Sequence, residues 1–406
     1  MQEKQVDYKL FFVVLAMIIF WMIMISSVSV YSSFRVTELM VKRWLIQEAY
    51  NHFYVLRNIA HVFISWILLA IVVKIHYSFF EKYAKHIFWF VIILLIIVLL
   101  IWMTLGWARW WINIPWLPFT IQPTELLKFS IIIYLASFFK KYKWYLNNFT
   151  NGFLPFMIII WIILLLVWLQ PDFWTIIVIV PISVIMFFYA WANIKHLLIM
   201  FVIWVILSTS IYMYWDYDKK TWKNLNNLWY ITQRIDNFLA NNKEAIRNKT
   251  INYQTEQALI AIWSWGFTWL GFWQSIQKFW YLPEVQWDFI FSVIIEELWF
   301  LWGFILLSLY LYIWYKWFYI ASKIQDVFAE LTAVWISSWI VLQAFINIWV
   351  NLNIVPLTWV TLPFISYWWS SLLSLMIALW VLLNISRYVD EKQSLYRTNK
   401  NKLLFK

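Results

Sequence analysis

The sequence predicts an all-helical integral membrane protein with about ten transmembrane helices, because of its composition and its long apolar runs. Of its 406 residues, 64% are hydrophobic and only 13% are charged, whereas soluble proteins average roughly 45–50% and about 25%. A transmembrane helix needs about 20 mostly apolar residues, and such runs recur along the chain. No soluble domain could bury that much apolar surface, so soluble enzyme classes are excluded.

The predicted spans follow one another from residue 10 to residue 385. They are Leu10–Val30, Ile59–Ile75, His86–Leu105, Leu126–Phe139, Phe153–Leu169, Phe173–Ala190, Leu197–Tyr214, Phe289–Tyr312, Val327–Val350 and Phe364–Ile385. The shorter runs leave nine or eleven spans as alternatives. The first run is longer than the apolar core of a signal peptide, about 7–15 residues, so we expect a retained anchor. We expect one polytopic membrane domain over 1–406, with a long extracytoplasmic loop at 215–287, between spans seven and eight, and a basic cytoplasmic tail at 388–406.

The distribution of charge predicts the orientation. The net charge is +11, and basic residues in membrane proteins gather in cytoplasmic loops. They follow the fourth, eighth and last spans, at Lys140, Lys141, Lys143, Lys316, Lys323 and in the tail after Arg387. With an even number of spans both termini are cytoplasmic, and the positive charge requires no nucleic-acid partner. The loop after the first span runs against this rule, because it carries Arg35, Lys42, Arg43 and Arg57.

Tryptophan and glycine occur in an unusual ratio. The chain has 35 tryptophans and 5 glycines, although a share of roughly 7% would give about 28 glycines. Several tryptophans stand where turns favour glycine, such as Trp273 and the pair Trp368 and Trp369. Our hypothesis is that the gene uses UGA for glycine and that about 23 of the tryptophans are glycines in the native protein. Trp111 and Trp339 do not stand at expected glycine positions, and we interpret them as genuine.

An acidic cluster at the start of the eighth predicted span is the first candidate site. Its acids are Glu284, Asp288, Glu296 and Glu297. Pro283 ends any preceding helix, which places Asp288 at the outer membrane surface. The last two acids lie deeper in the span, where an ionisable group is costly and therefore a functional candidate. The alternative is that Asp288 only caps the start of the helix.

Three further polar clusters lie on the same side of the membrane in this topology. Between the third and fourth spans, Arg109 lies in the outer loop, and Glu125 and Lys128 are spaced to pair on one helix face. A local ion pair is the alternative interpretation of those two. Gln170–Asp172 forms another outer turn, and Thr358–Ser371 contains a proline before the last span. Irregular backbone at membrane depth lines a cavity or is buried in protein. We therefore predict an outward-facing cavity for a substrate with a charged head and a lipid tail.

With glycine restored, four segments resemble motifs of the SEDS family of shape, elongation, division and sporulation proteins, which includes FtsW and RodA. Trp107–Lys128 is similar to GARxWI…QPSELxK, with Thr124 in place of serine. Gln170–Thr175 resembles QPDxGT, and Gln274–Glu297 resembles QSxQKxxYLPExxxDFIFxxxxEE. Gln343–Ser371 resembles QAFxNIGVNxGxxPxTGxTLPFxSYGGSS and looks more like FtsW than RodA. The resemblance covers most of the chain from residue 107 to residue 387.

The resemblance implies a peptidoglycan glycosyltransferase of the bacterial inner membrane that polymerises lipid II in septal cell-wall synthesis. It implies a class B penicillin-binding protein as transpeptidase partner, beside other membrane proteins of the division machinery. Asp288 takes the position of the catalytic acid. The expected substrate-binding residues are Arg109, Gln122, Glu125, Lys128, Asp172, Gln274, Lys278, Glu284, Ser370 and Ser371.

On this interpretation, the Asp288 carboxylate takes the proton from the 4-hydroxyl of the acceptor sugar. Arg109 and Lys128 stabilise the departing undecaprenyl pyrophosphate, and a divalent cation, Mg or Mn, could assist. The five histidines of the chain show no metal-ligand spacing. The family has His-Thr before the acid where this chain has Gln286 and Trp287. This departure affects the contacts expected with the acceptor sugar.

Two other functions are compatible with the same residues. A lipid II flippase could use Glu296 and Glu297 as a proton relay, and a division scaffold would need no chemistry at all. The three differ at Asp288. An alanine there should abolish polymerisation in an enzyme, leave flipping intact in a transporter, and still complement a deletion strain in a scaffold.

Overall fold

The structure is a computed structural model, and it confirms the helical membrane fold. It describes residues 7–72, 74–101, 111–113, 120–190, 251–264, 271–279 and 281–388, with single positions between 193 and 238. Six of the helices described are long and apolar enough to cross a membrane, and two shorter ones, Phe53–Ile67 and Phe173–Tyr189, are strongly apolar. The seventh predicted span lies largely outside the described residues, so the count of ten stays a prediction.

Helical segments match the other nine predicted spans. The bounds are α1 Tyr8–Val28, α2 Val30–Lys42, α3 Phe53–Val72, α4 Tyr77–Ile101, α5 Pro123–Lys141, η1 Lys143–Tyr145, η2 Phe149–Phe153, α6 Leu154–Leu169, α7 Phe173–Tyr189, α10 Ile251–Trp263, α11 Ile290–Leu298, α12 Phe300–Lys323, α13 Val327–Asn351 and α14 Trp369–Ser386. Two short antiparallel strands, β1 Ile112–Asn113 and β2 Thr120–Ile121, precede α5. They are a small departure from an all-helical fold.

Two predicted spans differ from the structure. The eighth is split into α11 and α12 at Trp299, whose backbone turns at φ 71° and ψ 164°. The tenth begins at Trp369 instead of Phe364, because the segment from Thr358 to Trp368 forms irregular turns around Pro363. Both differences have the same physical reason. At Trp299 and in the turns before Trp369 the backbone leaves helical geometry before the next helix starts.

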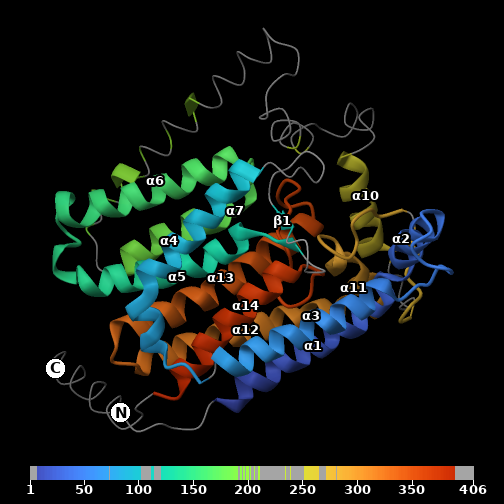
Figure 1. Ribbon diagram of the computed structural model, residues 1–406, viewed down its shortest axis with the longest axis horizontal. Coiled ribbons are helices and arrows are strands. Elements are labelled where there is room, and N and C mark those ends of the chain that lie inside the picture. Colours follow the sequence, from blue (N-terminus) through green and yellow to red (C-terminus); the bar gives the residue numbers. More distant parts are fainter. Residues whose placement is uncertain are drawn as a thin grey trace.

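Helices α13 and α14 form the centre of the bundle (Figure 1). In their membrane-spanning windows 78% and 89% of the residues are buried, against 33–44% for the other long helices. Helices α5 and α7 pack against α13, and α3 packs against α14. The peripheral helices therefore present mostly apolar side chains outward, as lipid-facing helices do, while the two central helices are free to carry polar groups.

The two ends of the bundle are formed by different elements and contacts. One end gathers ion pairs of Lys140 at the end of α5 with Glu81 and Asp326, each at 2.7 Å. The first and last helices meet at this end, where the Asp7 amide donates to Ser386 Oγ at 3.3 Å. At the opposite end α5, α7 and α14 begin, and β1, α2 and α10 lie there (Figure 1). The predicted orientation places the first end in the cytoplasm, and it stays a prediction.

The backbone supports the glycine hypothesis at particular tryptophans. Trp44, Trp273 and Trp299 all have positive φ, at 59°, 71° and 71°. The combination at Trp299 lies in a region that is essentially restricted to glycine. We expect mass spectrometry of the native protein to find glycine at residues 299 and 273, and at 368 and 369. Tryptophan at all four positions would refute the hypothesis.

Candidate functional site

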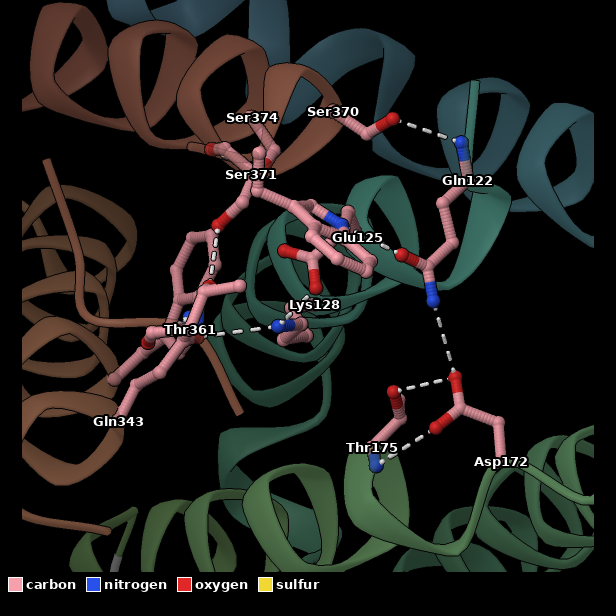
Figure 2. A network of polar contacts seen from close by, with 12 residues as sticks. Gln122, Glu125, Lys128, Asp172, Thr175, Gln343, Thr361, Ser370, Ser371 and Ser374 are labelled. Carbon is pink, nitrogen blue, oxygen red and sulfur yellow. Dashed lines mark hydrogen bonds and ion pairs between the residues drawn. The ribbon is translucent and has the colours of Figure 1, made fainter. Parts of the chain in front are cut away.

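A network of buried polar side chains lies at the end of the bundle where α5, α7 and α14 begin (Figure 2). Pro123 at the first position of α5 suits a helix start, and Glu125 and Lys128 follow on one face of the helix. The Lys128 ammonium donates to Glu125 Oε1 at 2.7 Å and to Gln343 Oε1 of α13 at 3.1 Å. Lys128 therefore joins α5 to the central helix.

The network continues from Gln343 to α14. Gln343 Nε2 donates to Thr361 Oγ1 at 2.9 Å and to the Thr361 carbonyl oxygen at 3.1 Å. Thr361 Oγ1 lies 3.2 Å from Ser371 Oγ. The irregular segment before α14 is thus held by side chains of both central helices, which explains why it can lie at depth in the bundle.

Asp172 fixes the other wall of the network. It is the N-cap of α7, accepting from the Thr175 amide at 3.2 Å and from the Thr175 hydroxyl at 2.8 Å. The side-chain Nε2 of Gln122 donates to the same carboxylate at 3.5 Å, and the backbone N–H of Gln122 donates to Ser370 Oγ at 2.9 Å. Asp172 is therefore placed by its own helix start and lies opposite α5 (Figure 2).

Part of this network lines a small cavity of about 20 Å³, which we call the polar cavity. It is bounded by Gln122, Glu125, Lys128, Asp172, Trp174, Thr175, Val178, Trp359, Val360 and Trp368. Glu125 Oε2 is buried and has no hydrogen-bond partner in the structure. A buried carboxylate oxygen without a partner is costly, so this wall favours a ligand that brings hydrogen-bond donors, such as the hydroxyl groups of a sugar.

Asp288 lies in the loop before α11, close behind the polar cavity. Asn347 and Asn351 of α13 each donate to the Asp288 carbonyl oxygen at 3.0 Å. Asn347 also donates to the carbonyl oxygen of Val360, a cavity wall residue, at 2.7 Å. The backbone at Asp288 is therefore fixed from the central helix, and a single amide side chain links it to the cavity wall.

The Asp288 carboxyl group itself is buried, and its Oδ1 has no hydrogen-bond partner. The N-cap of α11 is Phe289, and no side chain caps that helix, so the alternative in which Asp288 serves as a cap is wrong. Burial raises the pKa of Asp288 well above its usual range, and the charge of Glu284 raises it further. The charge of Arg234 acts in the opposite direction.

Arg234 connects this acid to the polar cavity. Its guanidinium stands 4.7 Å from the centre of the Trp359 ring and 5.4 Å from that of Trp174, and both rings line the cavity. It also donates to the Leu357 carbonyl oxygen at 2.7 Å. A cation is thus placed between the cavity wall and the acid, where it can attract an anionic group.

Four other predicted residues form a second group at α11 and the turn before it, and none of them lines the polar cavity. Lys278 pairs with Glu297 at 2.8 Å, and Glu296 accepts from the Ser275 hydroxyl at 2.6 Å. Gln274 lies in the same turn. The structure therefore brings Gln122, Glu125, Lys128, Asp172, Ser370 and Ser371 together, with Glu284 beside Asp288, and places Gln274 and Lys278 elsewhere. Arg109 lies outside the described residues.

The similarity to known proteins extends over almost the whole chain. The family model for the cell cycle proteins FtsW, RodA and SpoVE matches residues 8–391. The chain belongs to this family. Among its relatives in the FtsW/RodA/SpoVE family, a probable peptidoglycan glycosyltransferase FtsW of Bacillus subtilis (strain 168) is 31% identical over 98% of this chain and 94% of its own. The stage V sporulation protein E of the same organism is 30% identical over 83% of this chain and 88% of its own.

Solved structures confirm the fold of the family for this chain. A chain from a peptidoglycan synthase complex, described as coordinating polymerization and crosslinking, superposes with a TM-score of 0.71 at 21% identity, covering 95% of this chain and 99% of its own. The rod shape determining protein RodA of Thermus thermophilus superposes with a TM-score of 0.63 at 19% identity, covering 95% and 98%.

Some residues of the site were not singled out from the sequence. Gln343, Asn347 and Asn351 recur every four residues in the largely buried helix α13, so they share one helix face. That spacing of amides in an apolar helix was the available signal. Arg234 lies in the predicted outer loop and carried no comparable signal, because only the tertiary fold brings it to Asp288.

Proposed function

We propose that this chain joins lipid-linked cell-wall sugars into glycan strands, with Asp288 as the general base and the polar cavity as part of the substrate site. It is a peptidoglycan glycosyltransferase, as its FtsW relatives are named. The observation that carries the proposed mechanism is the buried Asp288 carboxyl group, which has an unpartnered oxygen and a fixed backbone. The substrate would be lipid II, whose anionic head and long lipid tail suit a cavity at the surface of a helical bundle.

The proposed reaction is a single displacement. The 4-hydroxyl oxygen of the acceptor sugar attacks the anomeric carbon of the donor, and the bond from that carbon to the phosphate oxygen breaks. Undecaprenyl pyrophosphate leaves with the electron pair, and the hydroxyl proton passes to the Asp288 carboxylate. Inversion at the anomeric carbon follows, because only one displacement occurs.

The leaving group carries negative charge, and cations near the cavity would stabilise it. Lys128 and Arg234 are the described candidates, and Arg109 remains expected at the same mouth. Lys128 faces Glu125 at 2.7 Å and shares the cavity with Asp172, so the described walls hold two carboxylates against one ammonium. Within the described residues no group of three acids or histidines could hold a metal ion.

We propose further that the enzyme acts at the septum with a class B penicillin-binding protein, in a bacterial plasma membrane with both chain ends in the cytoplasm. The end of the bundle that carries the Lys140 ion pairs would face the cytoplasm, and the polar cavity would face outward. A proton relay for flipping receives less support, because Glu296 accepts three hydrogen bonds and Glu297 is paired with Lys278.

A polymerisation assay tests the proposal directly. Purified full-length protein in vesicles with fluorescent lipid II should form glycan strands, and the strands should be degraded by a muramidase. The same vesicles report flipping if the lipid II begins in one leaflet only. Flipping without strand formation would favour the transporter. The absence of both activities, combined with full complementation of a deletion strain by Asp288→Ala, would favour the scaffold.

The pH dependence provides a second test. A general base acts when it is deprotonated, so the raised pKa of Asp288 predicts that polymerisation falls on the acid side at a higher pH than for an ordinary aspartate. Glu284→Gln removes a negative charge that raises this pKa, whereas the Arg234 charge that lowers it remains. The acid limb should therefore move to lower pH in that variant. We expect to see this in pH–rate profiles, and a limb that stays or moves to higher pH would contradict the assignment.

A further inference from the structure

Away from the polar cavity, a buried ion pair joins three separate parts of the chain. The Lys278 ammonium lies 2.8 Å from Glu297 Oε1, with the two side chains 2% and 0% exposed. Ser27 of α1 donates its hydroxyl to the same carboxylate oxygen at 2.6 Å. The ammonium also lies 2.9 Å from Ser27 Oγ and 2.7 Å from the carbonyl oxygen of Trp273. Helix α1, helix α11 and the turn before Asp288 therefore meet at one pair of charges.

The neighbouring acid holds the same turn by a different set of contacts. Glu296 Oε1 accepts from the amides of Ile276 and Gln277 at 3.0 and 3.3 Å. Its Oε2 accepts from the Ser275 hydroxyl at 2.6 Å. Two consecutive carboxylates of α11 thus hold the segment 275–278 to the end of that short helix, although no residue of this group lines the polar cavity.

The segment closed by this ion pair contains Asp288. Lys278 and Glu297 are 19 residues apart in sequence, and the loop between them runs past Glu284 and Asp288 into α11. Asn347 and Asn351 fix only the carbonyl oxygen of Asp288. The two ends of the loop, at Lys278 and Glu297, are held together by the ion pair, and both contact Ser27 of α1.

We propose that the Lys278–Glu297 ion pair is a positioning device that sets the location of Asp288 relative to the polar cavity. This inference rests on the proposed role of Asp288 as the base. Buried ion pairs add little net stability, because desolvation offsets their attraction, and apolar residues of similar size often serve as well. Their fixed hydrogen-bond geometry can instead specify one arrangement. A misplacement of a reacting group by about 1 Å can lower a rate by about 10²-fold.

The test compares single and double variants in the polymerisation assay. Lys278→Met alone leaves the buried Glu297 without its counter-ion and should destabilise the fold. Lys278→Met/Glu297→Met removes both charges and should melt near the wild-type temperature. We expect its kcat to fall by about 10- to 100-fold, with KM within about threefold of the wild type. We also expect the acid limb of its pH profile to move to lower pH, because a displaced Asp288 is less buried and stands in a changed field of Glu284 and Arg234.

The matched control is the exposed Lys42–Glu38 pair of α2, whose atoms lie 2.7 Å apart, against 2.8 Å for Lys278 and Glu297. Lys42→Met/Glu38→Met should change neither kcat nor the pH profile. A double variant at Lys278 and Glu297 that keeps both its stability and its full kcat would overturn the proposal, because the pair would then be structural only. Lys278→Arg, which can retain the ion pair, should recover part of the lost kcat.

A second readout does not depend on activity. The chain has no cysteine, and Gln286, two residues before Asp288, is 2% exposed. Gln286→Cys should resist maleimide labelling when the ion pair is intact and react faster in the Lys278→Met/Glu297→Met background. Equal protection of residue 286 in the two backgrounds would overturn the positioning proposal, whether or not the wild-type protein forms glycan. Failure of the wild-type protein to form glycan would count against the proposed function and not against the positioning role.

Discussion

Asp288→Asn is expected to abolish glycan strand formation while the protein stays folded. Loss of a general base typically lowers a rate by about 10²- to 10⁴-fold. Asparagine has nearly the same shape but cannot take a proton, and Asp288 Oδ1 has no hydrogen-bond partner in the structure that the change would break. Strand formation from fluorescent lipid II, followed on gels, measures the loss, and thermal melting in detergent measures the fold.

The control for this variant is an acid outside the site. Glu38→Gln alters an exposed carboxylate on α2, with 46% of its side chain accessible, and should leave polymerisation unchanged. If Asp288→Asn retained more than about half of the wild-type rate, the acid could not be the base, since the smallest usual effect is about 10²-fold.

The second large effect is expected at Lys128. Replacement by methionine removes the ammonium that joins Glu125 to Gln343 and leaves the Glu125 carboxylate uncompensated in the cavity. Removal of one group that stabilises developing charge typically lowers kcat by about 10²- to 10³-fold. We expect a loss of this size in the polymerisation assay with Lys128→Met, and a smaller loss with Lys128→Arg.

Lys140 offers a matched control on the same helix. It also pairs with two carboxylates, Glu81 and Asp326, but at the opposite end of α5 and with 35% of its side chain exposed. Lys140→Met should lower the melting temperature slightly and leave kcat unchanged. Equal losses of kcat at both lysines would indicate that α5 matters only for folding and would remove Lys128 from the proposed mechanism.

The spans could be predicted because membrane helices obey a simple length rule. Runs of about 20 apolar residues identify helices whatever they pack against, and α1, α6 and α13 lie within a few residues of their predicted bounds. The break at Trp299 could not be predicted, since tryptophan gives no signal for a backbone at φ 71° and ψ 164°. A glycine there would have marked the turn.

The polar cavity was partly predictable, because its residues occur in motifs that end up on one side of the membrane. Gln122, Glu125 and Asp172 were expected to converge, and the structure places all three around one cavity. Lys278 was expected at the substrate, and in the structure it forms a buried ion pair with Glu297. A lysine at the substrate and a lysine in a buried ion pair give the same sequence pattern, a basic residue near an acidic span. Only the path of the loop around α11 distinguishes the two.

The sidedness of Asp288 is the claim on which the rest depends, and cysteine labelling measures it directly. Because the chain contains no cysteine, Tyr281→Cys and Tyr145→Cys each give a single thiol at an exposed position, 50% and 54% accessible. The first lies in the loop that carries Asp288 and the second lies next to the end of α5. In intact spheroplasts, a membrane-impermeant maleimide should label residue 281 at once and residue 145 only after permeabilisation. The reverse pattern would place Asp288 on the cytoplasmic side, where the proposed polymerisation could not occur.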